Sequence, residues 1–419
     1  MNQADLLRSL PENIQSDIAT VHGQLNAKGF ECFLVGGCVR DLLLNKPIKD
    51  LDFTTNAEPT EVQKIFKRTV PTGIKHGTMT VLIEDRAYEV TTYRAEGNYS
   101  DARRPDRITF AKTLSEDLSR RDFTINALAL DPHTGKITDE HHGLIDLQNK
   151  ILRTIGKPEE RFFEDGLRTV RACRFASVLG FTIEPATLAA LSHPEIQKRT
   201  ALVAIERFTD ELWKGFRGDT VSTMILHLER TGLVDLFVNF PGRTSPDTLS
   251  AVDRMSYAEN RMGYWLSQFY PRQTAEIAIE PICRKLKFSG AQTQHCQVLA
   301  RIIAFSETAD SYSIPLVRRF CARLKRELNA PLNFLREISE IGEVGEIVPL
   351  TKLLLQQFQL ILGSDPLLPT DLHLDGNDLK SLGFQGKMIG EKIEELLSRV
   401  YEDPSLNSRE KLLELIRAK

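Results

Sequence analysis

The first part of the chain alternates short apolar runs with helical segments. The apolar run ECFLVGG (31–37) ends at two glycines and indicates a strand, VRDLLLN (39–45) has helical spacing, and IKDLDFTT (48–55) indicates a second strand. The segment TMTVLIEDRAYEVTTYR (78–94) alternates apolar and polar residues on both sides of 84–86, as a β-hairpin does. The pattern predicts an α/β head with a mixed sheet.

Beyond about Lys150 the strand pattern stops and helical periodicity takes over, as in PATLAALS, ERFTDELWKGF, VSTMILHLERTGL and GEKIEELLSRV. Proline and glycine interrupt it at 240–246 (FPGRTSP) and 363–370 (GSDPLLPT). We therefore expect an α+β protein, an α/β head followed by all-α domains. The predicted domains are a head at 1–150, a neck at 151–240, a body at 241–362 and a tail at 363–419.

Composition excludes several classes of protein. The chain has 419 residues, 41% hydrophobic and 26% charged, and no apolar run of bilayer length, so we expect a soluble globular protein with no membrane partner. The N-terminus lacks the pattern of a secretory signal, which favours a cytoplasmic location. Six cysteines without paired-ligand spacing argue against a zinc site and disulfides and indicate buried thiols. The net charge of −3 hides basic clusters at 153–174 and 318–326.

The two glycines at the end of the first strand stand where a backbone can approach a phosphate. Gly36 and Gly37 have no Cβ to block this approach, and Arg40 follows one turn later. A glycine pair after a strand is more often an ordinary turn. The sequence around it decides between the two interpretations.

Two aspartates follow on the next predicted strand. Asp50 and Asp52 are two residues apart, so on a strand both carboxylates point to the same face. Side-by-side carboxylates repel each other unless a cation neutralises them, and such oxygen ligands suit Mg²⁺. The alternative is an exposed strand edge that carries two aspartates. Glu89, on the second hairpin strand, is a candidate third carboxylate.

A resemblance rests on a series of motifs in order. LVGGCVRDLL with KDLDFTT, TGIKHGTMTV, YEVTTYRAEGNYSDARRPD, LSRRDFTINALAL and FFEDGLRTVRACRFA resemble successive motifs of the bacterial class II tRNA nucleotidyltransferases, the CCA-adding enzymes. They cover residues 30–180 densely. DLHLDGNDLKSLGFQGKMIGEKIEELLSRV also resembles the C-terminal tail of that family.

The resemblance implies roles for the matching residues. Asp50 and Asp52 would be catalytic and hold Mg²⁺, with Glu89 as a further candidate ligand. The residues implied to bind the nucleotide are Gly36, Gly37, Arg40, Arg121, Asp122, Asp165, Arg168, Arg171 and Arg174. Arginine can hold phosphate in a fork, and a carboxylate can accept from a ribose hydroxyl. The alternative for Asp122 is a helix N-cap.

The segment FFEDGLRTVRACRFA is expected to form one helix. At about 100° per residue, Arg161, Asp165 and Arg168 share one face. A carboxylate beside a guanidinium fits the amino donor and ring-nitrogen acceptor of cytosine or adenine and rejects uracil and guanine. The alternative is a surface ion pair. Gly166, inside this helix, is expected to loosen it by about 1 kcal/mol relative to alanine.

Two further features have both a functional and a structural interpretation. Arg174 falls near the apolar side of the predicted helix, so it is either a nucleotide contact or a paired structural residue. RAEGNYSDARRPDRITFAKT (94–113) is rich in charge and is expected to be a mobile loop; the resemblance equates it with the loop that switches the site from C to A. An ordinary linker is the alternative.

The resemblance implies a reaction. The 3′-hydroxyl of tRNA would attack the α-phosphate of CTP or ATP and release pyrophosphate, with two Mg²⁺ held by Asp50 and Asp52. The helical neck, body and tail would bind the RNA by its backbone and shape, and no protein partner is needed. The alternatives are a poly(A) polymerase, an enzyme that adds only CC or only A, and an inactive RNA-binding module. A paired metal site argues against the last.

Overall fold

The computed structural model describes residues 6–48, 50–95, 109–308, 313–324, 329–341, 348–362 and 365–417. The chain divides into two compact units, Met1–Asn239 and Phe240–Lys419. The finer division into head, neck, body and tail stays a prediction.

The first unit contains the predicted mixed sheet. Its order is β3-β4-β5-β2-β1-β6-β7, in which β2 and β5 are parallel and the other neighbours antiparallel. The predicted hairpin is confirmed, since β4 and β5 are joined by two residues, Glu84 at a φ of 52° and Asp85. The strands are β1 (Cys32–Val35), β2 (Asp52–Thr55), β3 (Thr69–Gly73), β4 (Thr78–Ile83), β5 (Arg86–Thr92), β6 (Leu128–Leu130) and β7 (Ile137–Asp139).

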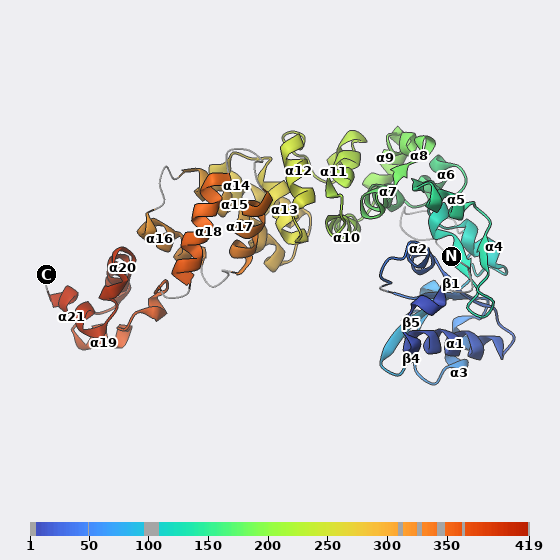
Figure 1. Cartoon of the computed structure of the whole chain (residues 1–419), viewed down its shortest axis with the longest axis horizontal. Coiled ribbons are helices and arrows are strands. Elements are labelled where there is room, and N and C mark those ends of the chain that lie inside the picture. Colours follow the sequence, from blue (N-terminus) through green and yellow to red (C-terminus); the bar gives the residue numbers. More distant parts are fainter. Residues whose placement is uncertain are drawn as a thin grey trace. The chain divides into compact units, whose positions relative to one another are not determined.

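Short helices cover this sheet. α1 packs on β1 beside α3, and α3 packs on β4 and β5 (Figure 1). Leu34, Phe53 and Val81 are fully buried between the layers. The helical elements are η2 (Leu7–Ser9), α1 (Glu12–Asn26), α2 (Gly37–Leu43), α3 (Pro59–Ile65), η3 (Ile74–His76), α4 (Leu114–Ser119), η4 (Thr124–Asn126) and α5 (Gly143–Gln148).

The rest of the first unit is almost entirely helical, with α7 packed against α10 and α11. Its helices are α6 (Pro158–Glu164), α7 (Leu167–Leu179), α8 (Pro185–Leu191), α9 (Pro194–Ala201), α10 (Ile205–Phe216), α11 (Val221–Arg230) and η5 (Val234–Leu236). The prediction that no strand follows Lys150 is wrong in detail. β8 (Ile151–Leu152) and β9 (Thr182–Ile183) form a short parallel pair, made by a contact too distant in sequence to leave a local pattern.

The predicted single helix through Asp165 is also wrong. The chain leaves helical geometry at Asp165, where φ is −139° and ψ is 107°, and α7 starts two residues later. The side chain of Asp165 accepts from the backbone N–H of Leu167 at 3.0 Å. A Cβ on Gly166 would lie 2.8 Å from the carbonyl oxygen of Arg199 and from the Cα of Thr200. Gly166 therefore permits close backbone contact with α9, rather than loosening a helix.

The described residues of the second unit are helical and without strands. α14 and α15 pack together, α13 packs on α15, and α16 packs on α20. A separate cluster around Leu379, Val400 and Leu412 forms a core near the C-terminus. The elements are α12 (Pro246–Arg254), α13 (Ala258–Ser267), α14 (Arg272–Lys285), α15 (Gly290–Thr308), α16 (Ile314–Leu324), α17 (Asn329–Ile341), α18 (Val348–Leu362), η6 (Pro369–Asp371), α19 (Gly376–Ser381), α20 (Lys387–Glu402), η7 (Pro404–Leu406) and α21 (Arg409–Arg417).

Two predictions from composition can be compared with these elements. All six cysteines are buried and unpaired, as expected. Among the helices of the described ranges, none has the length and apolar character needed to cross a bilayer.

Candidate active site

One cavity of about 1030 Å³ in the first unit brings together eleven of the twelve candidate site residues. Only Glu89 is not part of its lining. Eleven arginine and lysine side chains line the cavity against five aspartates. A chain of net charge −3 thus surrounds this cavity with positive charge, which suits a polyanionic ligand.

The glycine pair lies at the turn from β1 into α2. Gly36 has a φ of 74°, and a Cβ there would lie 2.8 Å from Nη1 of Arg121, so both the turn and the neighbouring guanidinium require glycine. Arg40 is buried; its Nη1 donates to Oδ1 of Asn126 at 2.7 Å and its Nε to Asp41 at 2.8 Å. The arginine is therefore held in one orientation beside Gly37.

The carboxylates of the predicted metal site lie at the start of β2. Asp52 is the first residue of β2, and Glu89 on β5 is its register partner. Asp50 precedes the strand, so the expectation that both aspartates lie on one strand is wrong, although both line the cavity. Burial, Glu89 and Asp50 together raise the pKa of Asp52 to about 6, against the opposing effect of Arg121.

Within the described ranges, no group of three or more His, Cys, Asp or Glu side chains is arranged to hold a metal ion. The acids at β2 therefore do not form a complete ligand set by themselves. Asp50, Asp52 and Glu89 also have no ion-pair partner among the described residues, and Glu89 and Asp50 add to the effect of burial in raising the pKa of Asp52. Such a set fits a divalent cation that takes its remaining ligands from substrate phosphate and water.

Arg121 is positioned by an acid that sequence analysis missed. Asp117, fully buried on α4, accepts from Nη2 of Arg121 at 2.9 Å and from Nη2 of Arg120 at 2.7 Å. Burial alone would raise the pKa of Asp117, but the two arginines lower it to about 2. The Nε of Arg121 is buried without a hydrogen-bond partner. This donor has no partner among the described residues, and Nη1 of the same guanidinium lies beside Gly36.

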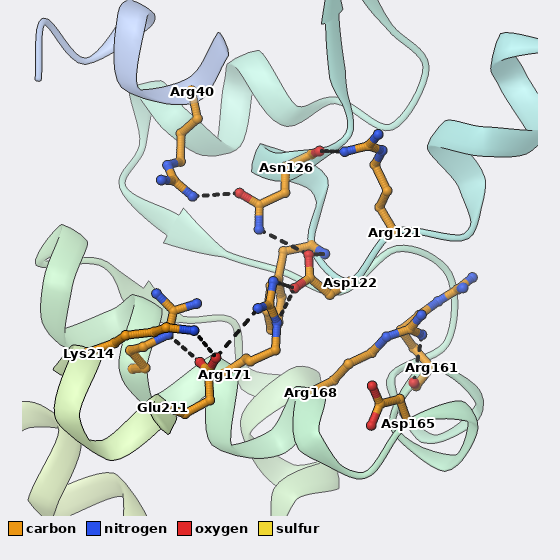
Figure 2. A network of polar contacts seen from close by, with 12 residues as sticks. Arg40, Arg121, Asp122, Asn126, Arg161, Asp165, Arg168, Arg171, Glu211 and Lys214 are labelled. Carbon is orange, nitrogen blue, oxygen red and sulfur yellow. Dashed lines mark hydrogen bonds and ion pairs between the residues drawn. The ribbon is translucent and has the colours of Figure 1, made fainter. Parts of the chain in front are cut away.

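A chain of polar contacts links the glycine turn to α7 and α10 (Figure 2). Asn126 accepts from Arg40 and donates through Nδ2 to Oδ1 of Asp122 at 3.0 Å. Arg171 on α7 donates to Oδ2 of Asp122 through Nε at 2.8 Å and Nη2 at 2.6 Å. Burial opposes ionisation of Asp122, but Arg171 and Asn126 hold its pKa well below the usual range.

The N-cap alternative for Asp122 is wrong. The nearby 3-10 helix starts at Thr124, and the N-cap position is occupied by Phe123, without a side-chain cap. Asp122 instead accepts from the N–H of Phe123 at 2.8 Å and holds Arg171.

Glu211 on α10 ends this chain of contacts. It pairs with Arg174, lies 3.8 Å from Nη1 of Arg171 and accepts from Lys214 at 3.3 Å. Burial raises the pKa of Glu211, but Arg174 and Arg171 lower it overall. Arg174 also lies over the ring of Phe175, with its Cζ 3.9 Å from the ring centroid. The paired, structural interpretation of Arg174 is thus present in the structure, although the residue also lines the cavity.

Asp165 and Arg168 line the same cavity, but they do not pair with each other. Arg207 on α10 donates to both oxygens of Asp165, at 2.9 Å and 3.3 Å. Arg168 pairs with Glu164 and donates to the carbonyl oxygens of Arg161 at 3.0 Å and Arg120 at 2.9 Å. The surface ion-pair alternative is therefore wrong, because each side chain is fixed separately.

The remaining candidate is the charged loop at 94–113. Its residues 96–108 lie outside the described residues, so its predicted role stays a prediction.

Two protein families match parts of the chain. Residues 32–153 match the "Poly A polymerase head domain" and residues 180–242 match the "Probable RNA and SrmB- binding site of polymerase A". The fold and these matches place the chain in the class of nucleotidyltransferases.

Individual relatives narrow this class. The chain is 53% identical to a CCA-adding enzyme of Enterococcus faecalis over 214 residues, and this alignment spans 51% of each chain. It is 40% identical to a CCA-adding enzyme of Lactobacillus johnsonii over 311 residues, and that alignment spans 73% of this chain and 75% of the relative. The crystal structure of the Bacillus stearothermophilus CCA-adding enzyme in complex with CTP matches with a TM-score of 0.77 at 28% identity, over 96% of this chain and 98% of that one. The chain belongs to the family of CCA-adding enzymes.

Proposed function

We propose that this protein adds CCA to the 3′ ends of tRNA from CTP and ATP, without a nucleic-acid template. The observation that carries the proposal is the cavity, which joins the acids of β2, the glycine turn and the residues around α7 in one site. A nucleotide can therefore contact groups suited to its triphosphate and groups suited to its base at the same time. The CTP complex of the Bacillus stearothermophilus relative supports the choice of nucleotide.

Asp50 and Asp52 are the proposed metal ligands, with Glu89 beside them. Their uncompensated negative charge and oxygen donors suit Mg²⁺, the divalent cation of choice for phosphate chemistry. When bound, Mg²⁺ supplies charge neutralisation at the reacting phosphate and lowers the pKa of the attacking hydroxyl.

Phosphate binding is proposed for Gly36, Gly37, Arg40 and Arg121. Gly36 and Gly37 have no Cβ that would block a phosphate, and Nη1 of Arg121 lies beside Gly36. The N–H of Gly36 already donates to the carbonyl oxygen of Leu128 at 3.2 Å, so the donors offered are the first N–H groups of α2, from Gly37 onward. Arg40 is already oriented by Asn126, so little side-chain entropy is lost on binding. These groups would hold the triphosphate in line for attack by the RNA 3′-hydroxyl, with pyrophosphate as the leaving group.

Base selection is proposed for Asp165 and Arg168, with Asp122, Arg171 and Arg174 supporting the nucleotide. Asp165 would accept from the exocyclic amino group of cytosine or adenine, and Arg168 would donate to the ring nitrogen. Arg168 uses three of its five donors within the protein, so donors remain for a base. The two side chains are not paired with each other; Asp165 is held by Arg207 and Arg168 by Glu164, so a base would bind to side chains that are already oriented.

The helices beyond residue 151 are the proposed tRNA-binding surface. The match of residues 180–242 to an RNA-binding model supports this for the neck, and a relative from Thermotoga maritima with the same fold is described as complexed with tRNA. The body at 241–362, the tail at 363–419 and a cytoplasmic location remain part of the proposal.

A direct test uses RNA transcripts that end before, within and at the end of CCA. Purified protein is incubated with each transcript and one nucleotide at a time, and the products are sequenced. We expect addition of C to the transcript that ends before CCA and to the one that ends in its first C. We expect addition of A to the transcript that ends in CC, and no addition to the transcript that ends in CCA. Repeated A addition to every transcript would instead show a poly(A) polymerase, and addition of C alone or A alone would show a partial enzyme.

A further inference from the structure

The cavity is longer than its proposed nucleotide site. α7 has 13 residues, and the cavity is lined from Asp165, before its first turn, to Leu179, its last residue. At 1.5 Å per residue this is about 20 Å. The α7 residues proposed to support the nucleotide end at Arg174. The C-terminal end of α7 therefore borders a part of the cavity that has no proposed ligand.

Two cations of the cavity lining, Lys46 and Arg217, belong to segments that contact Val178 near this end. Lys46 lies in the segment between α2 and β2, and its Nζ donates to the carbonyl oxygen of Val178 at 3.1 Å. Arg217 is the C-cap residue of α10, and its neighbour Gly218 packs so closely that a Cβ there would lie 3.0 Å from Cγ2 of Val178. Val178 thus contacts both segments, and the side chains of Lys46 and Arg217 line the cavity.

These two cations differ from the arginines along α7. Arg171 and Arg174 pair with buried acids, and Arg207 pairs with Asp165. In the described part of the chain, neither Lys46 nor Arg217 has an acidic partner. The ammonium group of Lys46 has three donors and uses one of them, on Val178. Uncompensated positive charge inside a cavity favours an anionic ligand.

We propose that Lys46 and Arg217 bind the phosphodiester backbone of the RNA acceptor end, which extends the site proposed above. Lys46 is four residues before Asp50, and both line the cavity. The triphosphate already has its proposed groups at Gly36 and Arg40, and neither Lys46 nor Arg217 is among them. The strand that carries the attacking hydroxyl needs a cationic contact of its own, and its backbone provides the anion.

The test compares binding of the two substrates. Lys46→Gln and Arg217→Gln remove the charges, and Gln keeps a donor for Val178. The matched control is Lys64→Gln on α3, because Lys64 is exposed and pairs with Glu61 at the surface. Initial rates give KM for an RNA hairpin that ends in CC and KM for ATP, at several KCl concentrations.

We expect KM for the RNA to rise about tenfold in each cavity variant, because a hydrogen-bonded charge contact is lost. The slope of log KM against log[KCl] should fall by about one per cation removed. KM for ATP and both values of the control should stay within about twofold of the wild type.

Three results would overturn the proposal. An equal rise in KM for ATP would mean that the cations hold the nucleotide, and unchanged KM for the RNA would mean that they hold nothing. A loss in Lys46→Ala that Lys46→Gln restores would mean that Lys46 acts only through Val178. Failure of the wild-type protein to extend any RNA would contradict the proposed function itself, which is a different outcome.

Discussion

The acids in and around the cavity fall into two groups with opposite electrostatics. At the start of β2, Asp52 has a pKa raised by burial and by the neighbouring Glu89 and Asp50. Around α7, Asp122 and Glu211 are also buried, yet arginines lower the pKa of both. We call the first group the unpaired acids (Asp50, Asp52 and Glu89) and the second the paired acids (Asp117, Asp122, Asp165 and Glu211).

This difference separates two uses of a carboxylate. A buried acid that is paired with arginine is part of the folded scaffold, and it fixes where that arginine points. Asp52 is half-buried without an ion-pair partner among the described residues, which costs stability, and such an acid is retained where a ligand supplies the missing charge. Substitution of the unpaired acids should therefore impair the chemical step, and substitution of the paired acids should impair folding or nucleotide selectivity.

The largest effect is expected from Asp52→Asn. Incorporation of both C and A should fall at least about a thousandfold, because charge stabilisation at the phosphate worth several kcal/mol is lost. The melting temperature should stay level or rise, since the repulsion with Glu89 disappears. Single-turnover incorporation and thermal unfolding measure the two effects, with exposed Asp85→Asn as the control. Loss of only one nucleotide would contradict a metal role shared by both additions.

A large loss of stability is expected from Asp122→Asn. Arg171, whose side chain is 31% exposed, then keeps only Glu211, at 3.8 Å, as an ion-pair partner among the described residues, and the loss of its nearer carboxylate should cost about 3 kcal/mol, the lower end of the range for a buried pair. Urea unfolding measures this change in the free energy of unfolding. Glu195→Gln is the matched control, because it breaks an exposed pair with Lys198 worth at most about 1 kcal/mol. If the free energy of unfolding fell by the same small amount in both variants, Asp122 would not stabilise the fold.

Nucleotide selectivity is the expected readout of Asp165→Ala. Loss of its acceptor should weaken discrimination of C and A over U and G by about one to two orders of magnitude. Arg168→Ala should lose fidelity similarly. Rates with all four nucleotides on an RNA ending in CC measure this. Turnover with the best nucleotide should fall less than in Asp52→Asn, and unchanged selectivity in both variants would remove the two residues from base recognition.

The smallest effect is expected from Gly166→Ala. Its new Cβ would meet the backbone of Arg199 and Thr200 at 2.8 Å, so the variant should lose about 1–3 kcal/mol of stability. Gly23→Ala in α1 is the control, because nothing lies within 4 Å of its Cβ position and alanine favours a helix. Equal or greater stability of Gly166→Ala would show that α6 and α7 do not need this close contact.

The sequence predicted the parts of the fold that local pattern determines. The turn at Gly36 and the hairpin around Glu84 follow from glycine placement and from alternation, and the structure contains both. The break at Asp165 did not follow, because its cause is contact with α9, more than thirty residues later. The pair β8 and β9 was missed for the same reason, since each strand has only two residues.

Prediction of the site from sequence is limited in the same way as prediction of the fold. Spacing identified candidate residues, but their partners come from other elements: Asp117 for Arg121, Asn126 for Arg40, and Arg207 for Asp165. Two of these had a usable signal. Asp117 is one helical turn before Arg121, and Arg207 shares the charged spacing of α10 with Glu211. Which opposite charges meet across elements depends on tertiary packing, which a single sequence does not display.

The central claim is that the unpaired acids hold a divalent cation while the paired acids do not. The most direct test is a Mn²⁺ titration, followed by the electron paramagnetic resonance signal of the free ion, with CTP present and RNA absent. We expect wild-type protein and Asp165→Ala to bind Mn²⁺ beyond that taken by CTP alone, and Asp52→Asn to bind none beyond it. Equal Mn²⁺ binding by Asp52→Asn and the wild type would contradict the claim.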